Sequence, residues 1–227
     1  MPDAVMLFAA GFGTRMAPLT ADRPKPLIPV GGKPLLDHAL GIAQSAGVGR
    51  IVVNTHYLGE QIATHLAESA VTLSPETPDI LDTGGGLRHA LPLLGAGPVF
   101  TLNTDAVWTG ENPLTRLARA WDPARMDALL LLIPREAALG HAGMGDFMPN
   151  PDGRLKRGPG AVYSGAQILK TGGLTEIPEQ VFSLNRLWNR MLERGRLFGV
   201  LHRGGWCDVG TPEGIPRAEA MLEADDV

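Results

Sequence analysis

The sequence predicts an α/β fold built on a single doubly wound, mostly parallel sheet with helices on both faces. Three observations support this prediction. The apolar runs lack polar alternation, helical stretches separate them, and 44% of the 227 residues are hydrophobic whereas 19% are charged. Strands that are apolar throughout are typical of parallel sheets, because helices cover both faces of such sheets. The length is sufficient for one sizeable domain.

The elements of the first half alternate regularly. We expect strands where apolar runs are short, and helices where apolar residues recur at helical spacing. In chain order, the expected strands are residues 4–10, 50–56, 98–105 and 128–134, and the expected helices are residues 34–48, 58–69, 84–94 and 113–121. The first of these helices has a proline near its start and Gly47 near its end, which are usual helix boundary signals.

The pattern loosens after residue 134. Glycine and polar residues are frequent in residues 140–165, where short strands are expected at 146–148 and 161–163. A helix at 182–195, a strand at 197–202 and a terminal helix at 211–224, capped by Thr211, should follow. Since no repeat or linker composition divides the chain, we expect one domain over residues 1–227. Its halves would be about 1–135 and a less regular 136–227.

Composition excludes several function classes. The formal net charge is −4 and no basic stripe occurs, so nucleic acid is not an expected partner. No apolar run approaches the ~20 residues that span a bilayer, so no membrane association is expected either. The single cysteine, Cys207, excludes an internal disulfide and a cysteine-based zinc cluster. We therefore expect a cytoplasmic location, with Cys207 as a small buried residue.

A glycine-rich turn follows the first strand, in the run LFAAGFGTRM at residues 7–16. It is not a P-loop, because no G-x-x-x-x-G-K-[ST] run occurs, and Met16 stands where a dinucleotide fingerprint has its third glycine. Two glycines still let the backbone approach a polyphosphate, and Arg15 and Lys25 add positive charge. Glycine spacing alone favours a plain turn, but the Pro-Lys-Pro element around Lys25 makes the pattern far more specific.

Two aspartates follow short apolar runs. Asp105 ends the strand in TLNTDAVW, and Asp208 lies in GGWCDVGTPEG. Ligands collect beyond the carboxyl ends of parallel strands, so Asp105 should face the same crevice as the glycine turn. Two carboxylates beside phosphates are the usual cradle for Mg²⁺. The alternative is that each aspartate is a turn former or a helix cap.

Together these motifs resemble the sugar-phosphate nucleotidyltransferases, whose signature begins L-A-A-G-x-G-T-R and continues to a K-P element. Phe8 replaces the usual leucine, and the family's later V-D-[VI]-G-T-P-E element resembles residues 208–213. The resemblance runs from about residue 5 to about residue 221. It implies a Rossmann-like fold of the nucleotide-diphospho-sugar transferase type, with a small irregular sugar-binding lobe. It also implies a nucleoside triphosphate and a sugar 1-phosphate as substrates, and Mg²⁺ as the cofactor.

The resemblance also assigns roles to residues. It implies that Arg15 and Lys25 are catalytic and contact the phosphates, and that Asp105 and Asp208 hold the metal. The implied nucleotide-binding residues are Ala10, Gly11, Gly13, Thr14, Arg15, Lys25, Thr83, Gly84 and Asn103. The implied sugar-binding residues are Asp146 and Gly165.

The run LDTGGG at residues 81–86 is expected to read the base. Three glycines leave room for a flat base against the backbone, although a flexible helix start capped by Thr83 is an equal alternative. Asp82 departs from the L-G-T-[AG] element of the wider family. It resembles instead the L-[ED]-T-G-G-G form of uridylyltransferases that act on N-acetylmuramate 1-phosphate. The lactyl carboxylate of that sugar calls for a cation, and the sequence does not choose among Arg154, Lys156, Arg157 and His141.

The implied activity is transfer of a nucleotidyl group from UTP to N-acetylmuramate α-1-phosphate, with release of pyrophosphate, in peptidoglycan recycling. Alternatives within the same chemistry are a mannose-1-phosphate guanylyltransferase and a glucose-1-phosphate uridylyl- or thymidylyltransferase. A different class is a catalytically silent regulatory protein that binds nucleotide-sugars. Such a protein should have lost a phosphate-binding cation or a metal-binding carboxylate, and all four residues are present here. The sequence does not predict the oligomeric state.

Overall fold

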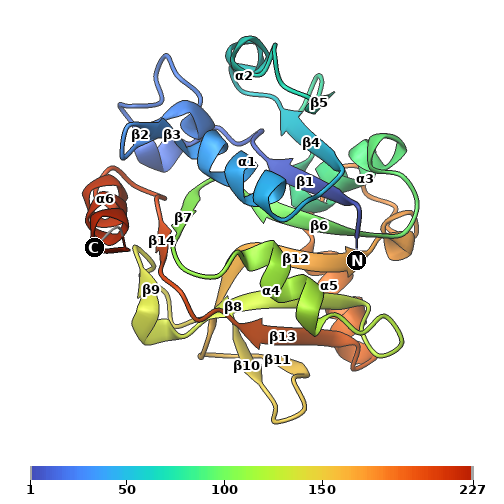
Figure 1. Ribbon diagram of the computed structural model, residues 1–227. Helices are drawn as coiled ribbons and strands as arrows, with labels where there is room; N and C mark the ends of the chain where they lie inside the picture. Colours follow the sequence, from blue (N-terminus) through green and yellow to red (C-terminus); the bar gives the residue numbers. More distant parts are fainter. Residues whose placement is uncertain (1, 226–227) are drawn as a thin grey trace.

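Seven strands form one mixed, mostly parallel sheet in the computed structural model, which describes residues 2–225 (Figure 1). The strand order is β13-β8-β12-β6-β1-β4-β5. Strand β12 runs antiparallel to β6 and β8, and the other four neighbouring pairs are parallel. The strands are β1 (Ala4–Phe8), β4 (Arg50–Thr55), β5 (Thr72–Pro75), β6 (Pro98–Asn103), β8 (Ala128–Ile133), β12 (Val162–Lys170) and β13 (Leu197–Leu201).

Helices cover both faces of this sheet. Alternate residues of β1 point to opposite sides: Val5 and Leu7 pack in a core with α1, α2 and α4, whereas Ala4 and Met6 pack in a core with α3 and α5. The helices are α1 (Leu35–Ser45), α2 (Gly59–His65), α3 (Asp82–Leu94), α4 (Pro113–Ala120), α5 (Asn185–Glu193) and α6 (Gly214–Asp225). No helix within residues 2–225 is both long enough and apolar enough to cross a membrane.

The expected α/β fold with a mostly parallel sheet is confirmed, but some boundaries differ. Strand β12 is nine residues long and lies inside the sheet, where the sequence predicted only residues 161–163. Its register shifts between Tyr163 and Gln167, and Gly165 there has φ +90°. This irregularity hides the strand from a simple pattern search. Helix α6 begins at Gly214, so Thr211 lies three residues ahead of it.

A second, three-stranded sheet was not expected from the sequence. It consists of β7 (Ala106–Trp108), β14 (Trp206–Asp208) and β9 (Ala138–Leu139), in the order β7-β14-β9. Helix α6 packs on β14 and lies beside the hairpin of β2 (Pro29–Val30) and β3 (Lys33–Pro34), so a red helix lies near a blue hairpin in Figure 1. There the backbone N–H of Gly31 donates to Glu219 Oε1 at 3.0 Å. The remaining hairpin joins β10 (Phe147–Pro149) to β11 (Leu155–Arg157).

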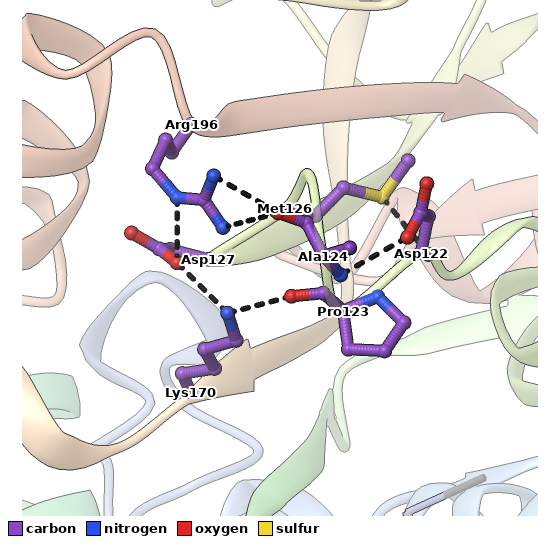
Figure 2. Close-up of polar contacts among 7 residues, drawn as sticks. All are labelled: Asp122, Pro123, Ala124, Met126, Asp127, Lys170 and Arg196. Carbon is purple, nitrogen blue, oxygen red and sulfur yellow. Dashed lines mark hydrogen bonds and ion pairs between the residues drawn. The ribbon is translucent and has the colours of Figure 1, made fainter.

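Three charged residues tie together β8, β12 and β13 at one end of the sheet (Figure 2). Asp127 Oδ1 accepts from Lys170 Nζ at 3.1 Å and lies 2.9 Å from Arg196 Nε. Burial disfavours the charged form of Asp127, but the bonds from Arg196 and Lys170 outweigh it and lower the pKa of this carboxyl. The two cations also donate to the backbone carbonyls of Ala124 and Pro123.

We predict that Asp127→Asn lowers the free energy of unfolding at pH 7 by about 1–3 kcal/mol, the usual contribution of hydrogen bonds to a charged group. Because the pKa of Asp127 is lower in the folded state, this contribution is present above the unfolded pKa of about 4 and disappears as pH falls through the folded value. Urea unfolding at pH 7 and pH 3 should therefore show a gap between variant and wild type that is smaller at pH 3.

Glu176→Gln is the matched control, because Glu176 pairs with Arg190 at an exposed position. Exposed pairs contribute little, so this variant should unfold like the wild type. Equal unfolding free energies of Asp127→Asn and the wild type at pH 7 would contradict the role given to Asp127.

Candidate functional site

A cavity of about 330 Å³ lies beyond the carboxyl ends of the parallel strands β1, β4, β5 and β6. This edge is where a doubly wound sheet usually binds its ligand. Most of the predicted nucleotide- and metal-binding residues line the cavity. They are Ala10, Gly11, Gly13, Thr14, Arg15, Lys25, Thr83, Asn103 and Asp105.

The glycine turn folds back on itself directly after β1. Gly13 has φ +63°, and its carbonyl accepts from the Met16 N–H at 2.8 Å and from Thr20 Oγ1 at 3.1 Å. Met16 is fully buried in a cluster with residues of β7 and β14, so it anchors the turn where a dinucleotide fingerprint would have glycine. A methyl group at Gly13 would lie 2.8 Å from Lys25 Cβ, so the turn and the lysine segment are in close contact.

The two predicted metal-binding aspartates meet because β7 pairs with β14. Asp208 lies opposite Ala106 in this antiparallel pair, and the Val209 N–H donates to the Asp105 carbonyl at 2.8 Å. Lys25 Nζ forms an ion pair with Asp105 Oδ2 at 2.9 Å.

Arg15 converges on the second carboxylate. A methyl group at Gly210 would lie 2.9 Å from Asp208 Oδ2 and 3.1 Å from both terminal nitrogens of Arg15. The structure thus brings Arg15, Lys25, Asp105 and Asp208 together, as the sequence predicted.

The environment of Asp208 disfavours its charged form. Burial raises the pKa of Asp208, the charge of Asp105 raises it further, and Lys25 and Arg15 oppose the rise. Carboxylate oxygens are hard donors, and Mg²⁺ is usually held by one or two carboxylates together with substrate phosphates. This donor pair fits that ion. Within residues 2–225 no group of three or more histidine, cysteine, aspartate or glutamate side chains is placed to hold a metal ion.

Cys207, next to Asp208, is not part of the site. Its side chain is fully buried in the same cluster as Met16, and burial raises the pKa of its thiol to about 11. The burial confirms the expectation of a small buried residue. A neutral thiol is also a poor nucleophile and a poor metal ligand.

A buried polar pair that the sequence did not predict supports the cavity. Asn54 Oδ1 accepts from the Ala9 N–H at 2.7 Å, and Asn54 Nδ2 donates to Glu76 Oε1 at 2.7 Å. Glu76 Oε2 in turn accepts from the Leu81 N–H at 2.6 Å, which ties the glycine turn to the start of α3. Asn54 lies near the carboxyl end of its strand, so the rule that found Asp105 could have found it; Glu76 follows β5, a strand the sequence did not predict.

Packed atoms fill the space that side chains would take at the three glycines of LDTGGG. Gly84 and Gly85 both donate their N–H groups to the Phe182 carbonyl, at 2.8 and 3.0 Å, and the chain before α5 fills the volume beside them. Gly84 therefore lies behind the cavity and does not line it. Asp82 and Thr83 do line the cavity, and the Thr83 hydroxyl accepts from the Leu184 N–H at 3.0 Å.

A second cavity of about 270 Å³ adjoins the first and shares four of its lining residues, Phe8, Asp82, Thr83 and Asn103. Asp146, predicted to bind the sugar, lines this second cavity, and its Oδ2 accepts from the Tyr163 N–H at 2.8 Å. Gly165 does not line it. A methyl group at Gly165 would lie 2.8 Å from Asn103 Cβ, so this glycine supports Asn103 from behind.

Arg157 is the one candidate cation for the sugar that lines the second cavity. Its guanidinium lies 4.8 Å from the centre of the Phe147 ring and 5.9 Å from that of the Trp188 ring. Burial lowers the pKa of Arg157, and the neighbouring Asp146 carboxylate opposes this effect. Arginine remains charged despite such shifts.

Known proteins resemble this chain in sequence and in fold. Residues 5–143 match the family described as the MobA-like NTP transferase domain. The N-acetylmuramate alpha-1-phosphate uridylyltransferase of Caulobacter vibrioides is 42% identical over 97% of both chains. The protein of the same name from Neisseria meningitidis is 33% identical over 96% of this chain and 98% of its own. The crystal structure of HddC from Yersinia pseudotuberculosis complexed with GMP-PN has a TM-score of 0.78 at 21% identity, covering 96% of this chain and 99% of its own. It has the same fold.

We predict that Gly13→Ala lowers kcat/KM for the nucleoside triphosphate by about 10- to 100-fold, because a shift of about 1 Å in a binding group can have such an effect. The new methyl group would push against Lys25 Cβ, and alanine is strained at φ +63°.

Gly32→Ala is the matched control, since Gly32 has φ +74° but a methyl group there would meet no atom within 4 Å among the described residues. Gly32→Ala should lose only the stability that the left-handed conformation costs and should keep its activity, whereas Gly13→Ala should lose more stability and also activity. Equal activity of the two variants would contradict the contact between the turn and Lys25.

Proposed function

The chain belongs to the MobA-like NTP transferase domain family, and on this premise we propose that it transfers the uridylyl group of UTP to N-acetylmuramate α-1-phosphate, releasing pyrophosphate. Family membership confirms the resemblance predicted from the motifs. The observation that carries the proposal is the convergence of Arg15, Lys25, Asp105 and Asp208 beside two adjoining cavities. Residues 1–135 supply most of the lining of the first cavity, where the nucleotide would bind. Residues 136–227 supply Asp208 and most of the lining of the second cavity, where the sugar would bind.

The reaction requires little proton chemistry. A sugar 1-phosphate is already anionic at pH 7, so one of its phosphate oxygens can attack the α-phosphorus of the triphosphate without a strong base. A new P–O bond forms in line as the bond from the α-phosphorus to the bridging oxygen breaks, and the electron pair leaves with pyrophosphate. The protein must align two anions that repel each other and offset the charge on the α-phosphoryl oxygens.

The four converging side chains and the glycine turn each have a place in this scheme. Arg15 and Lys25 offset phosphate charge, and the backbone N–H groups of the glycine turn are available to the phosphate oxygens. Asp105 and Asp208 would hold Mg²⁺, which when bound neutralises phosphate charge and orients the triphosphate. The second cavity, reached past Asn103 and Thr83, would hold the sugar.

Three features support this base and this sugar over the alternatives. The two relatives above carry the corresponding name, and their alignments cover nearly the whole chain. The LDTGGG element resembles the form found in uridylyltransferases of this kind. The cation at the second cavity suits an acidic sugar. We also propose that the enzyme acts in the cytoplasm, in peptidoglycan recycling.

A substrate panel tests the proposal. UTP, GTP, dTTP and ATP should each be combined with N-acetylmuramate, glucose and mannose 1-phosphates, with and without Mg²⁺, and scored by pyrophosphate release. We expect the highest kcat/KM for UTP with N-acetylmuramate 1-phosphate, and loss of turnover with EDTA. A preference for GTP with mannose 1-phosphate would favour the alternative transferase. Nucleotide binding without pyrophosphate release from any pair would favour a silent regulatory protein.

We predict that Asp105→Ala and Asp208→Ala each reduce kcat by at least about 100-fold, the usual scale for removing an electrostatic contact to the transition state. Asp22→Ala is the control, because Asp22 is exposed on the segment between the glycine turn and Lys25. Circular dichroism should show an intact fold in all three variants. Near-normal turnover of a folded Asp208→Ala enzyme would refute the metal assignment.

A further inference from the structure

The second cavity has an uneven set of charges. Of its twelve lining residues, Asp82, Asp146 and Arg157 are charged, and Arg157 is the one cation. Backbone N–H groups already engage both carboxylates: Thr83 donates to Asp82 at 2.5 Å, and Tyr163 donates to Asp146 at 2.8 Å. Within residues 2–225, no carboxylate oxygen lies within 4.0 Å of the Arg157 nitrogens.

Neutral groups hold the Arg157 guanidinium in place. Its Nη2 donates to Asn185 Oδ1 at 2.7 Å and to Asn189 Oδ1 at 3.1 Å, both on α5. The rings of Phe147 and Trp188 pack near it from β10 and α5. Amide oxygens and aromatic rings orient the guanidinium, and the Asp146 carboxylate acts on its charge from beyond 4.0 Å without forming an ion pair. In this arrangement Nη1 and Nε donate to no described residue. The second cavity is therefore lined by an oriented guanidinium whose Nη1 and Nε can donate hydrogen bonds to a ligand.

The other three candidate cations do not occupy this position. Arg154 forms an ion pair with Asp152 and donates to the Gly195 carbonyl. Lys156 neighbours Arg157 on β11, so its side chain points to the opposite face of the hairpin. His141 lies near Asp208 and does not line the second cavity.

We propose that Arg157 binds a carboxylate on the sugar substrate and thereby selects an acidic sugar 1-phosphate over its neutral counterpart. A guanidinium fork with free donors matches the two oxygens of a carboxylate. This inference rests on the proposed function, in which the lactyl group of N-acetylmuramate supplies the carboxylate. Asp146 and the amides of α5 would then border the uncharged part of the sugar.

The test compares two sugar phosphates that differ in the lactyl group. With UTP held at saturation, kcat/KM should be measured for N-acetylmuramate 1-phosphate and for N-acetylglucosamine 1-phosphate. Arg157→Gln should lower the value for N-acetylmuramate 1-phosphate by about 10- to 100-fold, the range expected for one charge-assisted contact, and leave the value for N-acetylglucosamine 1-phosphate nearly unchanged. Arg157→Lys should retain part of the preference, since lysine keeps the charge but loses the fork.

Two controls distinguish a change in sugar specificity from a general loss of folding or of UTP binding. Arg154→Gln removes a cation from the same hairpin and should keep the wild-type preference. In Arg157→Gln the KM for UTP should be unchanged, and circular dichroism should show an intact fold.

The two kinds of failure are distinguishable. An equal loss on both sugars, no loss on either, or a wild-type enzyme that does not discriminate between them would overturn the role of Arg157 while leaving the transferase activity in place. A wild-type enzyme that turns over neither sugar phosphate would overturn the proposed function and this inference with it.

Discussion

The close approach of two carboxylates is the constraint around which the site is organised. Asp105 and Asp208 come from distant parts of the chain, and the short antiparallel pairing of β7 with β14 brings them together. Burial and mutual repulsion both act against this arrangement, as the raised pKa of Asp208 reflects. Lys25 and Arg15 offset the repulsion, so these two cations stabilise the pair of carboxylates in the absence of substrate.

The same packing unit fixes the carboxylates and the cations. Met16 anchors the glycine turn in a cluster with Val107 of β7 and Cys207 of β14, the strands that flank the two aspartates. The turn and the strands are thus parts of one apolar cluster, so a shift of one would disturb the packing of the other. This explains why a methionine follows the glycines of this turn. The turn of the nucleotidyltransferase is held by side-chain packing, whereas the third glycine of a dinucleotide fingerprint serves close packing of helix against strand.

The sequence predicts where the site lies better than it predicts the strand and the buried polar residues that hold the site in place. Asp105, Arg15 and Lys25 follow from simple rules on strand ends and glycine turns, because those rules depend on local sequence. Strand β12 was largely missed, since Gln167 interrupts its apolar pattern and is buried there through bonds to Thr101 and Trp188 on other elements. Asn54 lies within reach of the strand-end rule, but its partner Glu76 follows β5, a strand that the sequence did not predict. The LDTGGG glycines left two interpretations open, because close packing against Phe182 and space for a base have the same sequence signature.

The cations of the two cavities have different partners, a carboxylate in the first and amide oxygens in the second. This difference suits the two cavities to different anions. In the first cavity Lys25 is already paired with Asp105, so a phosphate that enters must compete with that carboxylate for the ammonium group. An anion with one charge gains little free energy when it replaces Asp105 as the partner of Lys25. A triphosphate carries several charges, and its oxygens can also accept hydrogen bonds from the N–H groups of the turn, so its binding can offset the loss of that ion pair. In the second cavity Arg157 has amide and aromatic partners, so an entering carboxylate displaces no ion pair. A single negative charge is therefore enough to be recognised there.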